Sequence, residues 1–285
     1  VVLGLISMLT CALAQGAAGS FSGKGSVNFR DYSPLVTGML LPLMMPASVD
    51  FRILISAGLF AILVVKAPFG GTGENIFNPA AGGFAFAAIC WPQAMFSYPP
   101  VQSSQPAFAL ATEGLGHSAA YALQMDGRPG VDLLDMLLGN FIGPMGATNI
   151  LVILACLVYL IARRTVDWRL SGSFLATAAL MAFLFPRAGL GRGASVGYEI
   201  MSGMLLFAAV FLITDPVTSP KRSSSKVFYG AAAGVVIMLF RRFGGFEDSC
   251  VFAILLLNAF VYPIDRLNER LHSRKRRKIL ETGQV

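Results

Sequence analysis

Nine apolar segments dominate this chain, and they restrict its fold more than any other feature of the sequence. A helix needs about 20 residues to cross the hydrocarbon core of a bilayer, with a range of about 17–25. The segments lie at roughly residues 1–16, 34–47, 51–67, 79–96, 148–163, 168–186, 197–214, 226–241 and 249–264. Several are short, as occurs where irregular backbone lines a cavity inside a membrane protein. The pattern predicts an all-α, polytopic membrane protein.

The shortage of charged residues supports a surface that faces lipid. Of the 285 residues, 55% are hydrophobic and 13% are charged, whereas about 25% are charged in soluble domains. The chain starts at Val1, and residues 1–14 are already apolar, so we expect it to begin inside a membrane helix. A signal peptide is the alternative interpretation, but no basic region precedes the apolar run.

The spacing that metal sites require is absent from the sequence. The cysteines are Cys11, Cys90, Cys156 and Cys250, and each stands alone in an apolar segment. Isolated cysteines of this kind are mostly small buried hydrophobes, because metal sites need Cys or His at close spacing. His117 and His272 are far apart and build no histidine-rich site. We therefore expect no metal centre, and we expect no nucleic-acid partner.

The distribution of Lys and Arg predicts the orientation. The tail between Arg266 and Lys278 is the most basic part of the chain, and cytoplasmic loops of membrane proteins carry an excess of these residues. Threading back from a cytoplasmic tail through nine spans places most of the 22 Lys and Arg residues on the cytoplasmic side, with Arg241 and Arg242 as a local exception. The tail can also bind anionic membrane lipid, although a topological anchor is enough to explain its charge.

The threading divides the chain into four regions. They are a first membrane repeat at 1–96, truncated at its N-terminus, a non-cytoplasmic connector at 97–147, a second membrane repeat at 148–265 and a basic cytoplasmic tail at 266–285. Within the connector, residues 131–140 have the pattern of an amphipathic surface helix. Asp132 and Asp135 share one face of this helix, where they form either a solvated face or a ligand pair for a cation.

Two patterns rich in Gly and Pro recur at equal spacing. Pro42-x3-Pro46 is followed by Phe69-Gly-Gly71, and Pro216-x3-Pro220 is followed, after the same number of residues, by Phe243-Gly-Gly245. The repeat predicts a 5+5 arrangement of helices whose first helix is missing from this chain. An odd number of helices per repeat gives the two halves opposite orientations, which is the inverted repeat typical of transporters. Coincidence of Gly and Pro punctuation is the alternative.

The loop at 68–81, here called the glycine-rich loop, has the most informative composition in the chain. Gly70 and Gly71 permit backbone conformations closed to other residues, while Asn75 and Asn78 offer side-chain donors and acceptors. The helix after the loop starts with a proline, so the loop can present N–H groups to an anionic or carbonyl-rich ligand. A tight turn between helices is the alternative interpretation.

Ionisable residues near the predicted membrane boundary form a second group of candidates. Thr214 and Asp215 end a predicted span, where Pro216 stops the helix. Asp215 either binds a cation or a ring N–H, or it caps the following segment. Glu199 is either an intramembrane functional group, which is the default for such residues, or an interfacial one.

Several of these motifs together resemble one protein family. Phe69-Gly-Gly-Thr-Gly-Glu-Asn-Ile-Phe-Asn-Pro-Ala80 is similar to the family's GGxGxNxFNPA signature. Ser202-Gly-Met-Leu-Leu206 with Ile213-Thr-Asp-Pro-Val-Thr-Ser-Pro220 resembles its SG and TDPVTSP segments, and residues 242–265 resemble its FGG and NAxxPLID ending. The family is that of the D subunits (RnfD) of Rnf-type ion-translocating electron-transport complexes, which includes the B subunit of the Na⁺-pumping NADH:quinone reductase.

The resemblance implies a role in a bacterial plasma-membrane complex that transfers electrons between ferredoxin and NAD while it translocates Na⁺ or H⁺. It implies the A, B, C, E and G subunits as partners, and these must supply the iron–sulfur and nicotinamide steps because this sequence has no motif for them. The chain is then inactive alone. The implied cofactor is flavin, namely FMN joined to a threonine of the connector by a phosphoester, with riboflavin as a second candidate. The implied cofactor-binding residues are Ser118, Gly70, Gly71, Asn75, Asn78, Thr214 and Asp215.

The sequence departs from the family at the flavin acceptor. Residues 112–123 correspond to the family's motif D-G-x-S-G-A-T-P-L, with Ser118 in the acceptor position, Thr112 in place of Asp and His117 in place of Ala. A serine hydroxyl can form the same phosphoester, but the transferase that attaches FMN reads the motif. Covalent flavin, non-covalent flavin and the absence of flavin all stay open at this point.

Three functions are compatible with these observations: a redox-linked ion-pump subunit, a structural subunit that has lost its cofactor, and a stand-alone channel or transporter of small solutes. The glycine-rich loop and the TDPVTSP segment together favour the first, while the changed acceptor motif is the argument for the second. For the first function, we expect the two FGG loops and the Asp215 segment to line a central cavity between the repeats.

Overall fold

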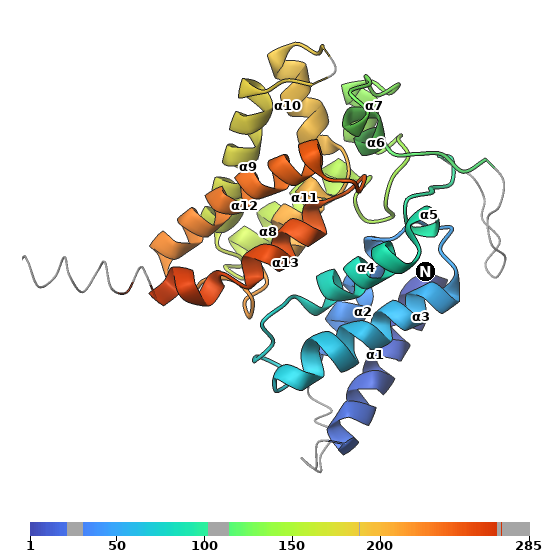
Figure 1. The fold of residues 1–285 in the computed structure, drawn as a ribbon, viewed down its shortest axis with the longest axis vertical. Helices are drawn as coiled ribbons and strands as arrows, with labels where there is room; N and C mark the ends of the chain where they lie inside the picture. Colours follow the sequence, from blue (N-terminus) through green and yellow to red (C-terminus); the bar gives the residue numbers. More distant parts are fainter. Residues whose placement is uncertain (22–30, 102–113, 188, 267–268, 270–285) are drawn as a thin grey trace, which may run out of the picture.

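The computed structural model describes residues 1–21, 31–101, 114–187, 189–266 and 269, and the regular structure in these residues is helical (Figure 1). They contain no strand, and the one β-type pairing among them is an isolated antiparallel bridge between Tyr98 and Gly116. The predicted all-α class is therefore confirmed for the described part of the chain. Thr112, His272 and nearly all of the basic tail lie outside these residues.

Four apolar helices make up the first half of the chain. They are α1 (Val2–Phe21), α2 (Ser33–Leu43), α3 (Phe51–Phe60) and α4 (Pro79–Cys90). Helix α3 continues directly into a π-helical segment, η1 (Ala61–Lys66), and a 3-10 turn, η2 (Ala67–Phe69). Helices α1 and α4 each pack against both α2 and α3. Together they form the lobe coloured blue to cyan in Figure 1.

Only short helices are described between the two halves. Helix α5 (Pro92–Met95) follows α4, while α6 (Ala119–Gln124) and α7 (Leu133–Leu138) belong to the connector. Helix α7 covers the centre of the predicted surface helix, and Asp132 and Asp135 are both exposed there. Their exposure fits the interpretation of this pair as a solvated face.

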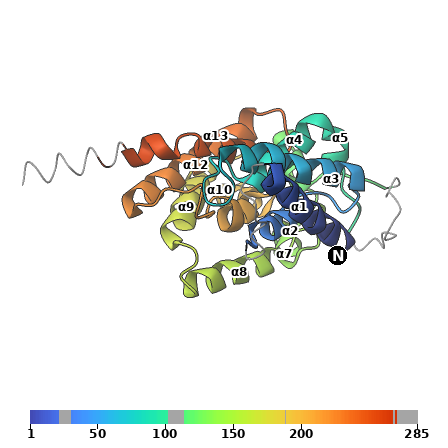
Figure 2. The same cartoon turned by 90° about the horizontal axis from the view of Figure 1, so that it is seen from below.

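The second half of the chain contains the remaining elements. They are α8 (Ile150–Ala162), α9 (Trp168–Leu184), α10 (Arg192–Met201), α11 (Leu205–Phe207), η3 (Ala208–Leu212), α12 (Ser223–Phe243) and α13 (Cys250–Asn258). Helices α9 and α12 make the most extensive helix pair of the molecule. Helix α8 lies at the edge of the molecule in Figure 2 and buries only Ile150 and Ile153.

The predicted span at 197–214 is not one continuous helix. Helix α10 ends at Met201, and the chain bends by 66° before it continues through α11 into the π-helical η3. Gly203, in the break, has a φ of +59°, a backbone conformation that favours glycine. The sequence predicted the apolar segment but not the break, because the apolar pattern runs through it and does not show that this glycine leaves the helical conformation.

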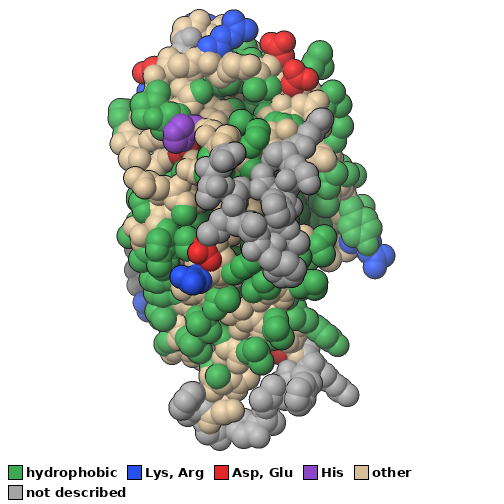
Figure 3. Space-filling model, turned by 90° about the vertical axis from the view of Figure 1, so that its right-hand side faces the viewer, with side chains coloured by type: hydrophobic (Ala, Val, Ile, Leu, Met, Phe, Trp, Pro, Cys, Tyr) green, Lys and Arg blue, Asp and Glu red, His purple; other side chains and the backbone are tan. Residues whose placement is uncertain are grey.

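Three helical segments of the described chain are long and apolar enough to cross a bilayer, namely Val2–Ser20, Phe51–Phe69 and Ser223–Phe243. The bent pair of α10 with α11 and η3 makes a fourth if it counts as one span, and α2, α4, α8 and α9 are apolar but shorter. Large hydrophobic side chains are exposed along these helices, and Figure 3 shows hydrophobic side chains spread over one side of the molecule. So much exposed apolar surface is suited to lipid rather than to water.

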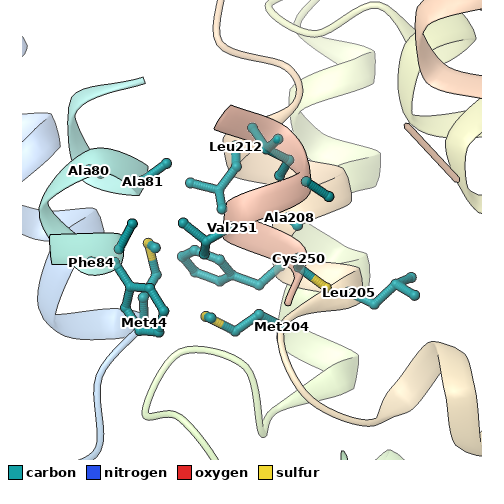
Figure 4. Packing of buried hydrophobic residues seen from close by; sticks show 14 of the residues in the cluster. Met44, Ala80, Ala81, Phe84, Met204, Leu205, Ala208, Leu212, Cys250 and Val251 are labelled. Carbon is teal, nitrogen blue, oxygen red and sulfur yellow. The ribbon is translucent and has the colours of Figure 1, made fainter. Parts of the chain in front are cut away.

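The main hydrophobic core joins the two halves across the middle of the molecule (Figure 4). Ala80, Ala81 and Phe84 of α4 lie opposite Cys250 and Val251 of α13. Residues from the end of α2, from α11 and η3, and from α3, α9 and α12 also belong to this cluster. The small side chains on α4 let the helices approach closely, as is common between membrane helices.

Helix α12 approaches α9 through a glycine. A Cβ atom on Gly230 would lie 2.1 Å from Ser173 Oγ and 2.6 Å from the carbonyl oxygen of Leu170. Gly230→Ala is therefore expected to destabilise the protein by about 1–3 kcal/mol through overpacking, despite a gain in helix propensity of up to about 1 kcal/mol. Thermal unfolding in detergent measures this loss. Gly172→Ala is the matched control in α9, because the nearest atom to the added Cβ would be Trp168 Cε3 at 3.7 Å. Equal unfolding temperatures for the two variants would contradict the packing argument.

Candidate functional site

A cavity of about 890 Å³ lies between the two halves of the chain. Its walls come from α2, the glycine-rich loop with the start of α4, one side of α8, and η3 with the segment that follows it. Most of the lining is apolar. The polar side chains that line it are Ser33, Thr37, Lys66, Thr72, Asn75, Asn78, Asn149, Thr165, Thr214 and Asp215. An apolar cavity with a few polar groups is typical of a site for a small organic ligand.

The glycine-rich loop has the backbone conformation that its glycines predicted. Gly70 and Gly71 have φ angles of +111° and +91°, which favour glycine over residues with a side chain. These two glycines shape the turn and are not part of the cavity lining, whereas Asn75 and Asn78 are. Asn75 Nδ2 donates a hydrogen bond to the carbonyl of Phe77 at 3.0 Å. The loop is thus both a tight turn and one wall of the cavity.

Asn78 holds the start of α4 and also reaches the second half of the chain. Its Oδ1 accepts a hydrogen bond from the backbone N–H of Ala81 at 3.1 Å, as an N-cap does, and Pro79 occupies the first helical position. Its Nδ2 donates to Asp215 Oδ2 at 3.3 Å. Two motifs that are far apart in the sequence therefore meet at the cavity.

Asp215 accepts hydrogen bonds from three groups. Besides Asn78, they are the backbone N–H of Val217, 3.1 Å from Oδ1, and the hydroxyl of Thr218, 3.1 Å from Oδ2. Burial raises the pKa of Asp215 above its ordinary value, and the bonds from Val217 and Thr218 oppose that shift. The contact with Val217 is a local cap, which is one of the two roles that the sequence analysis gave for Asp215. The contact with Asn78 adds a long-range role beside the cavity.

The polar contacts extend from this pair into the core. The side-chain amide of Asn258 suits its neighbours best when its oxygen accepts from the backbone N–H of Asn78 at 3.0 Å and its nitrogen donates to the Tyr229 hydroxyl at 2.9 Å. Thr214 lines the cavity, and its hydroxyl donates to the carbonyl of Val210 in η3. Asn75, Asn78, Thr214 and Asp215, all predicted from the sequence, are thus brought to one place.

Lys66 is a candidate that the sequence analysis missed. Its side chain is 2% exposed and lines the cavity. The Nζ atom donates to Ser33 Oγ and lies 3.8 Å from Asp31 Oδ2. The threading treated Lys66 as a loop charge, although its place at the end of an apolar run indicated that a helix carries it. A buried ammonium group needs polar partners, and with these partners it gives the cavity a positive pole.

The second FGG loop, residues 243–245, does not line this cavity, which corrects the expectation that both loops would. Instead, the carbonyl oxygen of Gly244 accepts a hydrogen bond from Gln124 Nε2 at 2.8 Å, so this loop lies against the connector helix α6. The expectation was inconsistent with the predicted repeat itself. Equivalent loops of two halves with opposite orientations lie at opposite faces of the membrane and cannot share one cavity.

A second polar cluster, made of Arg187, Glu199, Ser202, Arg241 and Asp248, is buried at the break between α10 and α11. The Glu199 carboxylate lies 3.0 Å from Arg241 Nη1 and 3.4 Å from Arg187 Nε. Arg241 also donates to the carbonyl oxygens of Glu199 at 2.6 Å and Ser202 at 2.9 Å, at the end of α10. Asp248 accepts from the backbone N–H at the start of α11. Glu199 is therefore a buried residue that is ion-paired with both arginines.

Ser118 is not placed to carry a flavin phosphate. Its side chain is 3% exposed, and its hydroxyl accepts a hydrogen bond from the backbone N–H of Ala120 at 3.1 Å as the N-cap of α6. Its own backbone N–H donates to Glu247 Oε1 at 3.2 Å. A phosphoester would remove the cap and place a second acidic group beside a buried carboxyl group, which is unfavourable. The residues around Ser118 therefore do not fit covalently attached FMN.

In the described ranges, no group of three or more His, Cys, Asp or Glu side chains is arranged to hold a metal ion. The four cysteines are free, and Cys11 and Cys250 among them are buried. Two polar groups of the described residues involve the residues singled out from the sequence. One is the cavity with Asn78 and Asp215, and the other is the buried cluster around Arg241.

Comparison with known proteins gives a consistent result. The family model described as the NQR2, RnfD, RnfE family matches residues 1–273. The D subunit of the ion-translocating oxidoreductase complex of Halorhodospira halophila is 30% identical, covering 95% of this chain and 84% of the relative. The D subunit of the Na(+)-translocating ferredoxin:NAD(+) oxidoreductase complex of Acetobacterium woodii is 31% identical, covering 87% of this chain and 75% of the relative. The D subunit of the ion-translocating oxidoreductase complex of Salmonella arizonae is 32% identical, covering 83% of this chain and 76% of the relative.

Proposed function

We propose, because the chain belongs to the NQR2, RnfD, RnfE family, that it is a membrane subunit of a complex coupling electron transfer between ferredoxin and NAD to the transport of Na⁺ or H⁺. The observation that carries the proposal is the extent of the family match, residues 1–273. The glycine-rich loop, the connector and the Asp215 segment all lie within it. Several relatives are D subunits of ion-translocating oxidoreductase complexes, and we extend that role to this chain.

The geometry supports a site between the two halves. The hydrogen bond from Asn78 to Asp215 joins the family's two signature segments at the cavity. In transporters built from repeats, the functional site lies near the interface of the repeats. The same contact would be unexpected if the two motifs served only as local turns. We therefore assign the function to the interface and not to either half alone.

The inverted 5+5 repeat is part of the proposal. Helices α4 and α13, the last helices of the two halves, which the repeat makes equivalent, pack together, and Asn78 at the start of α4 contacts Asn258 at the end of α13. Equivalent helices pack together in this way when they lie close to a pseudo-twofold axis. We further propose the four regions that the threading defines, a plasma-membrane location, a cytoplasmic C-terminus, activity only within the complex, and the A, B, C, E and G subunits as partners.

We place a flavin, FMN or riboflavin, in the cavity without a covalent bond. The cavity volume of about 890 Å³ lies in the range of about 300–1,000 Å³ that holds small-molecule ligands. Asn75, Asn78, Thr214 and Asp215 would hold its polar edge, while Lys66 would favour an anionic group. When bound, an isoalloxazine ring supplies one- and two-electron exchange. A ligand that fills the cavity would displace water from its apolar walls, and this would strengthen each polar contact inside.

The proposal is tested in membrane vesicles from a strain that lacks this chain and from the same strain with the full-length gene restored. Ferredoxin-dependent NAD⁺ reduction and the accompanying ion uptake are expected only after restoration. Denaturation of the purified complex should release the flavin of this subunit, and Ser118→Ala should not change the amount. Unchanged reduction and uptake without the chain would contradict the redox role. A fluorescent subunit band on a denaturing gel that disappears in Ser118→Ala would contradict non-covalent binding.

The second candidate is a flavin-free structural subunit of the same complex. The observation that favours it is the burial of Ser118, whose hydroxyl serves as a helix cap in place of a cofactor acceptor. The same vesicles separate the two candidates. A structural subunit would be required for assembly of the complex but would contain no flavin, whereas the redox subunit would contain flavin in the assembled complex. Ion uptake without any electron donor would instead indicate a stand-alone channel.

A further inference from the structure

Glu247 is an acidic residue that the rest of the buried cluster does not neutralise. It lies in the loop between α12 and α13 and is 6% exposed. The neighbouring cluster, which Glu247 meets at Asp248, contains Arg187 and Arg241 with two positive charges, and Glu199 and Asp248 with two negative ones. Glu199 pairs directly with both arginines. The cluster is thus balanced without Glu247, and an ionised Glu247 adds a negative charge to it.

One oxygen of the Glu247 carboxyl group has no hydrogen-bond partner among the described residues. Oε1 accepts from the backbone N–H of Ser118 at 3.2 Å, whereas the buried Oε2 has none. The nearest basic atom to Oε2 is His117 Nδ1, at 3.8 Å. The other titratable groups that face Glu247 are the buried Tyr98 and the neighbouring Asp248. Burial, with a smaller effect of Asp248, raises the pKa of Glu247 to about 7.

His117 connects this carboxyl group to water. Its side chain is 56% exposed, and its ring stacks on Tyr121 with centroids 4.1 Å apart and an angle of 21° between the planes. The preceding residue, Gly116, is held by two backbone hydrogen bonds of 2.9 Å to Tyr98. The imidazole is therefore fixed between a buried acid and the solvent. An imidazole can act as a proton shuttle, because each of its two ring nitrogens can carry a proton.

We propose that Glu247 is a proton-binding site, open through His117 to the aqueous phase on the connector side, and that its occupancy controls how tightly the connector docks on the second half of the chain. The proton on Oε2 passes to the Nδ1 lone pair of neutral His117. A gap of 3.8 Å needs a small side-chain rotation or one bridging water. The imidazolium then releases its Nε2 proton to solvent, which leaves Glu247 as the carboxylate.

The connector is linked to this site through helix α6. Three hydrogen bonds hold α6 on the second half: Ser118 N–H to Glu247, Gln124 Nε2 to the carbonyl of Gly244, and Arg187 Nη1 to the carbonyl of Leu123 at 3.4 Å. When α6 is docked on the second half, Glu247 binds its proton more tightly than when α6 is released. The reason is that burial in the docked state raises the pKa of Glu247. Docking is therefore strongest below about pH 4.5, weakens as the pH rises to about 7, and stays constant above that.

Infrared spectroscopy of the lipid-reconstituted complex that contains the full-length chain tests the proton site. A band of a protonated carboxyl group should titrate in the neutral range, and it should be absent in Glu247→Gln and unchanged in the exposed control Asp135→Asn. In His117→Gln the band should remain, with slower exchange in heavy water. A spectrum in which Glu247→Gln removes no such band would overturn the proposal. Loss of the band on adding sodium at constant pH would overturn it in favour of a metal-cation site.

Hydrogen exchange tests the link to docking. Glu247→Gln has the size and neutrality of the protonated form and can still accept the Ser118 N–H, so it should fold and stay docked at every pH. We expect peptides from 114–124 to exchange faster in the wild type than in Glu247→Gln above pH 7, and equally below about pH 4.5. Equal exchange at both pH values would contradict control of docking. Neither measurement uses flavin, ferredoxin or ion transport, so its outcome is separate from that of the proposed redox function.

Discussion

Replacing Arg241 by methionine is expected to destabilise the protein by about 3 kcal/mol. Breaking a buried ion pair by removing one partner costs about 3–5 kcal/mol, because the remaining charge and hydrogen-bond acceptors lose their compensation. Arg241 is 3% exposed and donates to both the carboxylate and the carbonyl of Glu199 and to Ser202. The lower end of the range applies since Arg187 still faces Glu199 at 3.4 Å.

The measurement is the rate at which a thiol reagent labels Cys250 itself, followed by peptide mass spectrometry during heating in detergent, because the exposed Cys90 reacts without unfolding. Cys250 is fully buried next to Asp248 in the same cluster, so its labelling reports the loss of this region. Arg242→Met is the matched control, because Arg242 is the adjacent residue, carries the same charge and is exposed. The buried cluster would not stabilise the fold if Cys250 became accessible at the same temperature in both variants.

Asn78 and Asp215 form a hydrogen-bonded pair at the cavity. Changing either residue alone should reduce function, and exchanging the two side chains should restore part of it. In Asp215→Asn an amide replaces the carboxylate that accepts from Asn78, Val217 and Thr218. In Asn78→Asp the helix cap is kept, but two carboxylates face each other. Each single change leaves a buried polar group poorly satisfied, at a cost of about 1–3 kcal/mol. That corresponds to a loss of about 5- to 150-fold in flavin retention and coupled ion uptake.

The double variant Asn78→Asp with Asp215→Asn restores a carboxylate–amide pair with the donor on the opposite side. We expect it to recover part of the flavin content and uptake lost in the singles, because coupled residues show interaction energies of about 0.5–3 kcal/mol. Asp135→Asn, at an exposed position of the connector, controls for removal of one acidic charge. A double variant that loses as much as the two singles combined would show that the pair does not act as a unit.

The features that the sequence predicted well are the local ones. The positive φ angles of Gly70 and Gly71 follow from the residue type, and so does the start of α4, where Asn78 precedes a proline. The starts of α3, α4 and α9, at Phe51, Pro79 and Trp168, also match the predicted boundaries. Each of these features is determined by residues only a few positions away in the chain, so its physical cause can be read from the local sequence.

The buried charges could not be predicted in the same way. Lys66, Arg241 and Glu247 lie in or next to loops. At such positions the neighbouring sequence looks the same whether a charged side chain faces water or is buried with partners. What distinguishes them is a partner far along the chain, such as Glu199 for Arg241 or Ser118 for Glu247. The same reason explains Ser118 itself, since its motif suggested an acceptor hydroxyl while its surroundings make it a helix cap.

The break between α10 and α11 has a consequence for where a charged solute can pass. Broken membrane helices expose a partial negative charge at one half-helix end and a partial positive charge at the other, and transporters commonly use these ends to coordinate ions or substrates. Here the guanidinium of Arg241 covers the carbonyl end of α10, and the carboxylate of Asp248 covers the N–H end of α11. The partial charges at the break are thus neutralised by side chains of the protein itself. An ion that crosses the membrane near the break must therefore be stabilised by other groups.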